Sequence, residues 1–157
     1  MLLLQRQEFA HLRIAALDVI LPRPAVIGQL QQTVDAALAR LRSIADAEAA
    51  RLLAPGKWSP KQVMGHLVDS AANNHQRLVR AQERQALDFP GYAQDHWVGC
   101  QHYNDRGWED LTGLWHAYNR HLAHVIRQIP EARRDTPCKV GADAPVTLGF
   151  LAHDYVV

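Results

Sequence analysis

Apolar residues recur at intervals of three or four positions along most of the chain, which is the spacing of one face of an α-helix. The first such stretch covers about residues 25–53, and proline and glycine in the following "APGK" end it. Its apolar positions are Val26, Leu30, Val34, Leu38, Leu41 and Ile44. The pattern therefore predicts a long first helix with one buried side.

A second helix is predicted from Ser59 to about Gln85. Ser59 suits the N-cap, Pro60 suits the first helical turn, and Gln62 completes a capping box with Ser59. Its expected core face consists of Val63, Leu67, Ala71, Asn74 and Leu78. This is the most sharply marked helix start in the sequence.

Two further helices follow. The third extends from Trp108 to Ile129, where Pro130 ends it, and the fourth begins after the cap residue Thr147. The core positions of these two helices are Leu111, Leu114, Trp115, Tyr118, Leu122, Val125, Ile129, Leu148, Leu151 and Tyr155. Between the helices, residues 86–107 and 130–146 have no helical periodicity and are predicted as long loops, and no run of alternating strands is evident. The fold class expected is all-α, a four-helix bundle with a short fourth helix.

Composition supports one soluble domain. The chain has 157 residues and a net charge of +1 with histidine neutral, which excludes nucleic acid or an anionic membrane as the main partner. The first residues lack the unbroken apolar stretch of a signal peptide, so we expect a cytoplasmic protein.

Residues 1–24 are interpreted as an N-terminal extension, and residues 25–157 as the helical domain. Cys100 and Cys138 form no CxxC pair and are expected to be reduced thiols.

One side of the second helix carries an unusual row of polar residues. His66, Ser70, Asn73 and Arg77 are three or four positions apart, so they stack along the helix beside its core face. In one interpretation these side chains lie at the boundary of the core and meet solvent. In the other, His66 binds a metal ion, because neutral imidazole is a common ligand and bundle cores build metal sites from facing helices.

Other histidines are candidate partners in such a site. His121 and His124 are three positions apart on the third helix, and His121 borders the core stripe. On the fourth helix, His153 falls outside the face that carries Leu148 and Leu151. We therefore rank His121 above His153 as a candidate metal ligand.

Several phrases together resemble the DinB/YfiT-like superfamily. They are "KWSPKQVMGHLVDSAANNHQRLVRAQ", "DFPGYAQDHWV", "WHAYNRHLAHVIRQIP" and "VTLGFLAHDYVV", and the resemblance covers about residues 25–157. It implies a four-helix bundle with one metal ion held by three histidines. The ligand in the G-H-L-x-D phrase corresponds to His66, and the other two are expected in a D-Y-V-x-H-x-x-H-H phrase.

The sequence reaches "DYVV" at residues 154–157, just before the expected second and third ligands. His153 precedes this phrase, so the resemblance gives it no role. Three explanations remain open. The natural chain continues past Val157, which the unbroken match favours; the gene product is shortened and lacks metal; or His121, His124 or His153 replaces the missing ligands.

The resemblance implies a metal-dependent enzyme that acts on a small molecule, as a hydrolase or a transferase of a low-molecular-weight thiol. The ion is zinc, nickel or iron, between which histidine ligands do not choose. Asp69 and Asn73 are candidates to orient His66 or the substrate, and Arg77 to bind an anionic group. The alternative is a non-catalytic bundle that binds a ligand or partner without metal. A homodimer is expected from the resemblance alone.

Overall fold

The computed structural model describes residues 24–156 of the chain. The predicted N-terminal extension therefore lies outside the described residues, apart from Pro24. Within residues 24–156, no helix is both long enough and apolar enough to cross a membrane.

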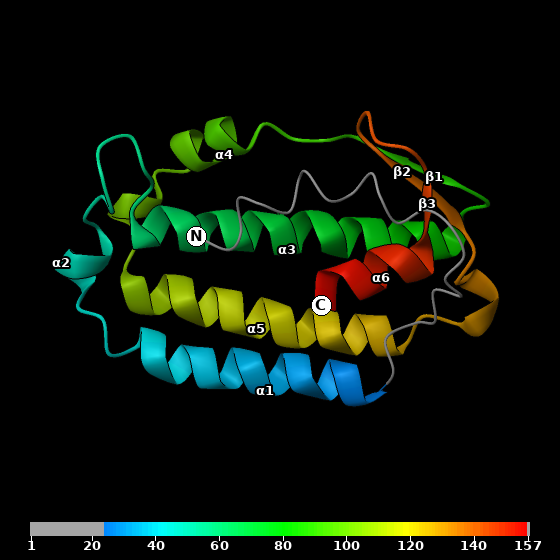
Figure 1. Ribbon diagram of the computed structural model, residues 1–157, viewed down its shortest axis with the longest axis horizontal. Coiled ribbons are helices and arrows are strands. Elements are labelled where there is room, and N and C mark those ends of the chain that lie inside the picture. Colours follow the sequence, from blue (N-terminus) through cyan, green and yellow to red (C-terminus); the bar gives the residue numbers. More distant parts are fainter. Residues whose placement is uncertain (1–23, 157) are drawn as a thin grey trace.

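Four helices form the body of the molecule, as the sequence predicted (Figure 1). They are α1 (Pro24–Leu41), α3 (Pro60–Glu83), α5 (Trp108–Arg127) and α6 (Leu148–Val156). α3 and α5 run in the same direction, and α1 and α6 run in the opposite one. α5 lies between α1 and α3, and α6 packs against α3 and α1. Because α3 and α5 are parallel neighbours, a long connection must carry the chain back along the bundle between them.

The predicted helix starts are confirmed at two places. Ser59 caps α3: its hydroxyl accepts a bond from the Gln62 amide, and the Gln62 side chain bonds back to the Ser59 amide. At α6, the hydroxyl of Thr147 accepts a bond from the Phe150 amide at 3.1 Å. These side chains supply partners for amides that have none within the helix.

The first helix is shorter than predicted, because it ends at Leu41 and not near Leu53. The chain turns there and forms the short helix α2 (Asp46–Ala49). The turn places Asp46 between two other elements: its carboxylate accepts bonds from the Trp108 amide at 2.8 Å and from the Lys61 ammonium at 2.9 Å. Asp46 thereby caps α5 and neutralises a lysine whose side chain is only 4% exposed.

Both predicted loops contain secondary structure. The first carries β1 (Leu87–Phe89), α4 (Gln94–Cys100) and the 3-10 helix η2 (Tyr103–Asp105); the second carries η3 (Glu131–Arg133), β2 (Pro137–Val140) and β3 (Val146–Thr147). The strands form a sheet in the order β1-β2-β3, with β1 parallel and β3 antiparallel to β2. The absence of strands was therefore a wrong prediction. Strands of two to four residues are too short to show alternation in a sequence.

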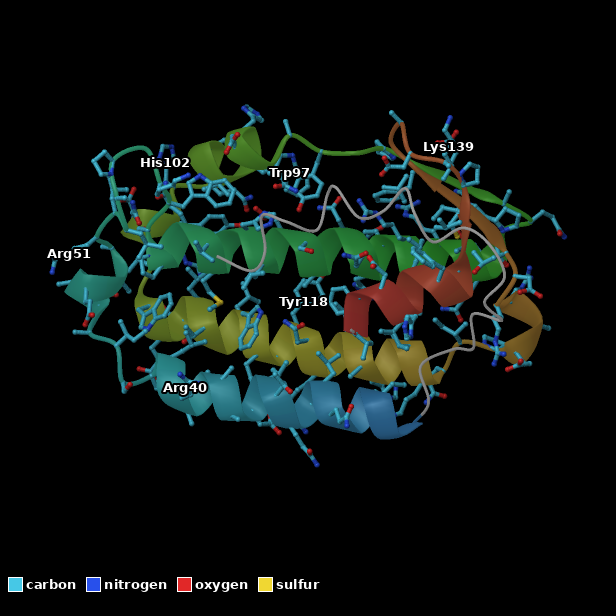
Figure 2. All side chains as sticks on the ribbon, in the orientation of Figure 1. Arg40, Arg51, Trp97, His102, Tyr118 and Lys139 are labelled. Carbon is cyan, nitrogen blue, oxygen red and sulfur yellow. The ribbon has the colours of Figure 1, made fainter. Side chains whose placement is uncertain are left out.

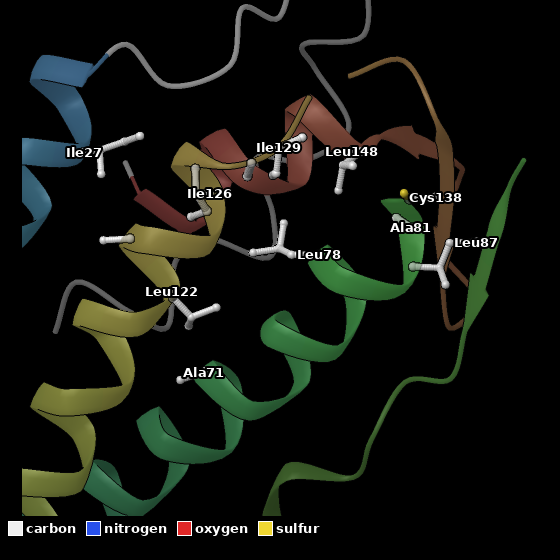
Figure 3. Close-up of a cluster of buried hydrophobic side chains, with 12 residues drawn as sticks. Ile27, Ala71, Leu78, Ala81, Leu87, Leu122, Ile126, Ile129, Cys138 and Leu148 are labelled. Atoms are coloured by element: carbon white, nitrogen blue, oxygen red, sulfur yellow. The ribbon is translucent and has the colours of Figure 1, made fainter. Parts of the chain in front are cut away.

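Two clusters of buried apolar residues hold the bundle together. The larger one joins all four helices and the sheet, and Figure 3 shows Ile27, Leu78, Leu122, Ile126 and Leu148 converging in it. The second fills the end of the bundle near α2 and α4 with Ala49, Met64, Val68, Val98, Tyr103, Trp108 and Leu111. The predicted core face of α3 is confirmed at Ala71 and Leu78, whereas Val63, Leu67 and Asn74 are only half-buried. Met64 and Val68 are buried in their place, because α4 and η2 cover that side of the helix.

Candidate metal centre on α3

The polar row on α3 lies under the α4 region, and its members are partly or fully shielded from solvent. Asn73 is buried with 7% exposure, and His66, Ser70 and Arg77 are half-buried. Figure 2 shows Trp97 of α4 over α3, on the side away from α5. The row is therefore neither part of the apolar core nor open surface, since the segment between β1 and α5 covers it.

His66 occupies a sheltered position in the second turn of α3. Its ring packs against Trp58 with ring centroids 5.3 Å apart, and its Nδ1 atom is buried without a hydrogen-bond partner within the described structure. Burial lowers the pKa of His66, and the nearby carboxylates of Asp69 and Asp95 only partly oppose this effect. The imidazole is therefore neutral near pH 7, which is the form that binds a metal ion.

Asp69 lies one turn further along α3 and is 3% exposed. Its Oδ1 atom accepts a hydrogen bond from the Tyr103 hydroxyl at 2.7 Å and another from the side-chain amide of Gln101 at 2.8 Å. Its Oδ2 atom is buried and bonds to none of the described residues. The carboxylate is thus fixed by two donors from the α4–η2 segment, while one oxygen remains able to accept a further bond.

Tyr103 and Gln101 belong to the surroundings of Asp69 although no sequence pattern assigned them to the site. Tyr103 reaches Asp69 because Gly65 has no side chain: a Cβ on Gly65 would lie 2.0 Å from the Tyr103 ring. Gly65 directly precedes His66 in the "GHLVD" phrase. A glycine inside a predicted helix is a sequence signal that another part of the chain packs closely against the helix there. Burial, and then the bond to Asp69, raise the pKa of Tyr103, so its hydroxyl stays protonated and donates.

Asn73 and Arg77 continue the row. The side-chain amide of Asn73 donates to the backbone carbonyl oxygen of Asp69 at 2.9 Å, so this amide already has a partner within α3. The Arg77 guanidinium stacks over the Phe89 ring, 5.5 Å from its centroid, and its Nε atom is buried without a partner in the described region. Burial lowers the pKa of Arg77, and Tyr92 and Asp143 act in the opposite direction. An arginine nonetheless stays charged at any physiological pH.

A groove of about 280 Å³ lies between α3 and the segment that joins β1 to α4. Its wall is mostly apolar and includes three aromatic residues, of which Tyr92 and Trp97 have ring centroids 4.8 Å apart. The lining residues are Ala72, Asn73, Gln76, Phe89, Pro90, Gly91, Tyr92 and Trp97. Asn73 therefore belongs both to the polar row and to the groove.

The candidate replacement ligands His121, His124 and His153 lie in different surroundings. His121 is exposed on α5, with ring centroids 4.9 Å from His75 and 6.5 Å from His124. His153 is half-buried on α6. Among residues 24–156, no group of three or more His, Cys, Asp or Glu side chains is arranged to hold a metal ion. The assignments of His66, His121 and His153 as ligands, and of Asp69, Asn73 and Arg77 around them, thus stay predictions.

The residues at His66 nevertheless fit the metal that the resemblance implies. A neutral, sheltered imidazole is a suitable donor, and the free Oδ2 of Asp69 is a suitable acceptor beside a metal-bound water or ligand.

Comparisons with known proteins agree with the fold. A solved structure described as "YfiT from Bacillus subtilis is a probable metal-dependent hydrolase with an unusual four-helix bundle topology" is similar to this chain, with a TM-score of 0.62 and 16% sequence identity. The match covers 83% of this chain and 80% of that one. A search of curated proteins finds no significant match. The sequence profile described as the DinB superfamily matches residues 21–156, and the chain therefore belongs to the DinB superfamily.

Proposed function

We propose that this protein is a metal-dependent enzyme that acts on a small molecule, with His66 as one ligand of a divalent ion. The observation that carries the proposal is the sheltered state of His66, whose ring is neutral and whose Nδ1 atom is buried without a partner in the described structure. The description of YfiT as a probable metal-dependent hydrolase supports the same class of activity.

A divalent ion with histidine ligands would supply Lewis-acid chemistry, by lowering the pKa of a bound water or thiol. The residues of this chain would prepare the site. Trp58 excludes water from one side of the His66 ring, and Asp69 offers its free Oδ2 to accept a proton or a hydrogen bond from the nucleophile. Tyr103 and Gln101 would keep that carboxylate oriented. Asp69 is thus the residue that we propose for a positioning or proton-accepting role.

The other ligands would come from a segment that approaches the first turns of α3. α6 runs antiparallel to α3 and points along it toward the end that carries His66 (Figure 1). A helix following the course of α6 would extend along α3 toward its first turns. This direction supports the ligand arrangement that the family resemblance implies, and it favours such ligands over His121, whose ring neighbours are His75 and His124.

The groove and Arg77 suggest what the substrate looks like. The mostly apolar wall, with three aromatic residues in it, favours an apolar or planar part of a ligand, and Arg77 would pair with an anionic group such as a carboxylate. Both hydrolysis and transfer of a low-molecular-weight thiol remain within the proposal, because a metal site of this kind activates either nucleophile. A cytoplasmic location and a homodimer are also part of the proposal.

The experiment is metal analysis of three purified proteins without affinity tags, each expressed from the complete natural coding sequence. They are the unmodified protein, His66→Ala and the control His96→Ala, which removes an exposed histidine of α4. We expect close to one ion per chain in the unmodified protein and in His96→Ala, and at least a tenfold loss in His66→Ala with unchanged helix content. Metal retained in His66→Ala would refute the assignment. No metal in any of the three would favour the non-catalytic bundle.

A further inference from the structure

A second group of histidines lies where α3 meets α5, away from the polar row. His75 is half-buried on α3, and His121 and His124 are exposed on α5. The rings of His75 and His121 lie 4.9 Å apart at an interplanar angle of 84°. Because these two rings come from different helices, the contact depends on the packing of the bundle and not on the spacing of residues within one helix.

Tyr118 lies within hydrogen-bonding distance of His75. The Tyr118 hydroxyl lies 3.3 Å from Nδ1 of His75, and Figure 2 shows Tyr118 between α3 and α5. Burial raises the pKa of Tyr118, so the hydroxyl is neutral and can accept a bond from Nδ1–H. In that tautomer the Nε2 lone pair of His75 is available. An imidazole held through its second nitrogen is the usual arrangement of a histidine that binds metal.

The separation of the two rings suits one shared ion. Two imidazoles that bind a zinc ion at about 2.0–2.1 Å with a near-tetrahedral angle have ring centres roughly 5 Å apart. The observed centroid distance of 4.9 Å is close to this spacing, so the two helices already hold the rings near enough to share an ion. The rings meet edge to face at 84°, so the exposed His121 ring would turn about its side-chain torsions to direct a nitrogen at that ion. The ring centroid of His124 lies 6.5 Å from that of His121, farther than the spacing of two ligands on one ion, so His124 is a weaker partner.

We propose that His75 and His121 form a metal site that joins α3 to α5 and is separate from the site at His66. Two imidazoles and bound water would complete the coordination, which favours late first-row divalent ions, with Cu²⁺ bound more tightly than Ni²⁺ or Zn²⁺. The ion would link two helices of the folded protein, so it would stabilise the folded state over the unfolded one. This inference does not depend on the proposed enzymatic function.

The test uses the untagged full chain with His66→Ala, which removes the other predicted ligand. Cu²⁺ and Zn²⁺ are titrated by calorimetry, with circular dichroism to confirm that each variant is folded. We expect one Cu²⁺ per chain and an electron paramagnetic resonance spectrum of Cu²⁺ bound to two imidazole nitrogens. His75→Gln and His121→Gln should each weaken Cu²⁺ binding at least tenfold, whereas the matched variant His124→Gln should change it less than threefold.

Two results would overturn the proposal. If His75→Gln binds Cu²⁺ as tightly as its parent while His121→Gln and His124→Gln both weaken binding, the ion sits along α5 and does not join the helices. If none of the three variants changes the affinity, binding is adventitious. A Tyr118→Phe variant gives an independent reading: it should weaken Cu²⁺ binding modestly, because it releases the ring of His75 without removing a ligand.

Discussion

The hydroxyl of Tyr103 donates a 2.7 Å hydrogen bond to Oδ1 of Asp69, across 34 positions of sequence. Both residues are buried, at 5% and 3% exposure, and Oδ2 of the same carboxylate has no partner within residues 24–156. The bond therefore connects the α4–η2 segment, which covers the polar row, to the helix that carries His66. It holds a buried carboxylate in place beside the proposed metal ligand.

Removing the Tyr103 hydroxyl should destabilise the fold. In Tyr103→Phe the carboxylate of Asp69 keeps only the bond from Gln101, and loss of a hydrogen bond to a buried charged group costs about 1–3 kcal/mol. Urea unfolding followed by circular dichroism measures this change. Tyr92→Phe serves as the control, because its hydroxyl is not one of the two donors to Asp69, and it should shift stability by less than about 0.5 kcal/mol. Equal stability of Tyr103→Phe and the unmodified protein would contradict the importance of the bond.

The Tyr103 ring packs so closely against α3 that position 65 has no room for a side chain. A Cβ at this position would lie 2.0 Å from that ring, so Gly65→Ala must displace Tyr103 and should destabilise the protein by about 1–3 kcal/mol or more. At Gly113 in α5, a Cβ would meet no atom within 4 Å, so Gly113→Ala should stabilise the protein by about 0.5–1 kcal/mol through helix propensity. Opposite signs in urea unfolding are expected. A stabilising Gly65→Ala would show that the contact with Tyr103 is not tight.

Asp46 should make stability depend on pH in the acid range. Bonds from Lys61 and then from the Trp108 amide lower the pKa of Asp46 below its ordinary value of 3.8. A lowered pKa means that the stabilisation is present above the ordinary value and is lost as the pH falls through the lowered pKa. The urea midpoint of the unmodified protein should therefore exceed that of Asp46→Asn at pH 5–7, and the difference should shrink below about pH 4. A difference independent of pH would contradict this role.

The two cysteines should differ in reactivity. Cys138 is fully buried, and burial raises the pKa of its thiol to about 11, whereas Cys100 is exposed. A thiol reagent at pH 7.5 should modify one cysteine of the native protein rapidly and the second only after denaturation. Cys100→Ser should abolish the rapid phase. Rapid modification of both thiols in the native protein would show that the sheet region opens readily.

The sequence predicted the helices well because their signals are local. The capping box at Ser59 and the apolar spacing on α5 depend on neighbours within one or two turns, and the family phrase "GHLVD" identified His66 as the candidate ligand. The break after Leu41 was missed because its cause is distant: Asp46 turns away to cap α5, 62 positions later in the chain. The helix propensity of the residues that follow Leu41 does not depend on the Trp108 amide, so it could not reveal this contact.

The surroundings of the site were less predictable for the same reason. Tyr103 and Gln101 reach Asp69 from a segment without helical periodicity, and the contact depends on how η2 packs against Gly65. The pair of His75 and His121 likewise arises only when α3 and α5 lie side by side. Sequence spacing gives neighbours on one helix and not those across two.

The most direct test of the proposed function is the metal content of the complete natural protein and of His66→Ala, measured by elemental analysis after dialysis against a weak chelator that strips loosely held ions. We expect close to one divalent ion per chain in the first protein and at least a tenfold lower content in the second, with equal helix content. An undiminished ion in His66→Ala, or none in the natural protein, would contradict it.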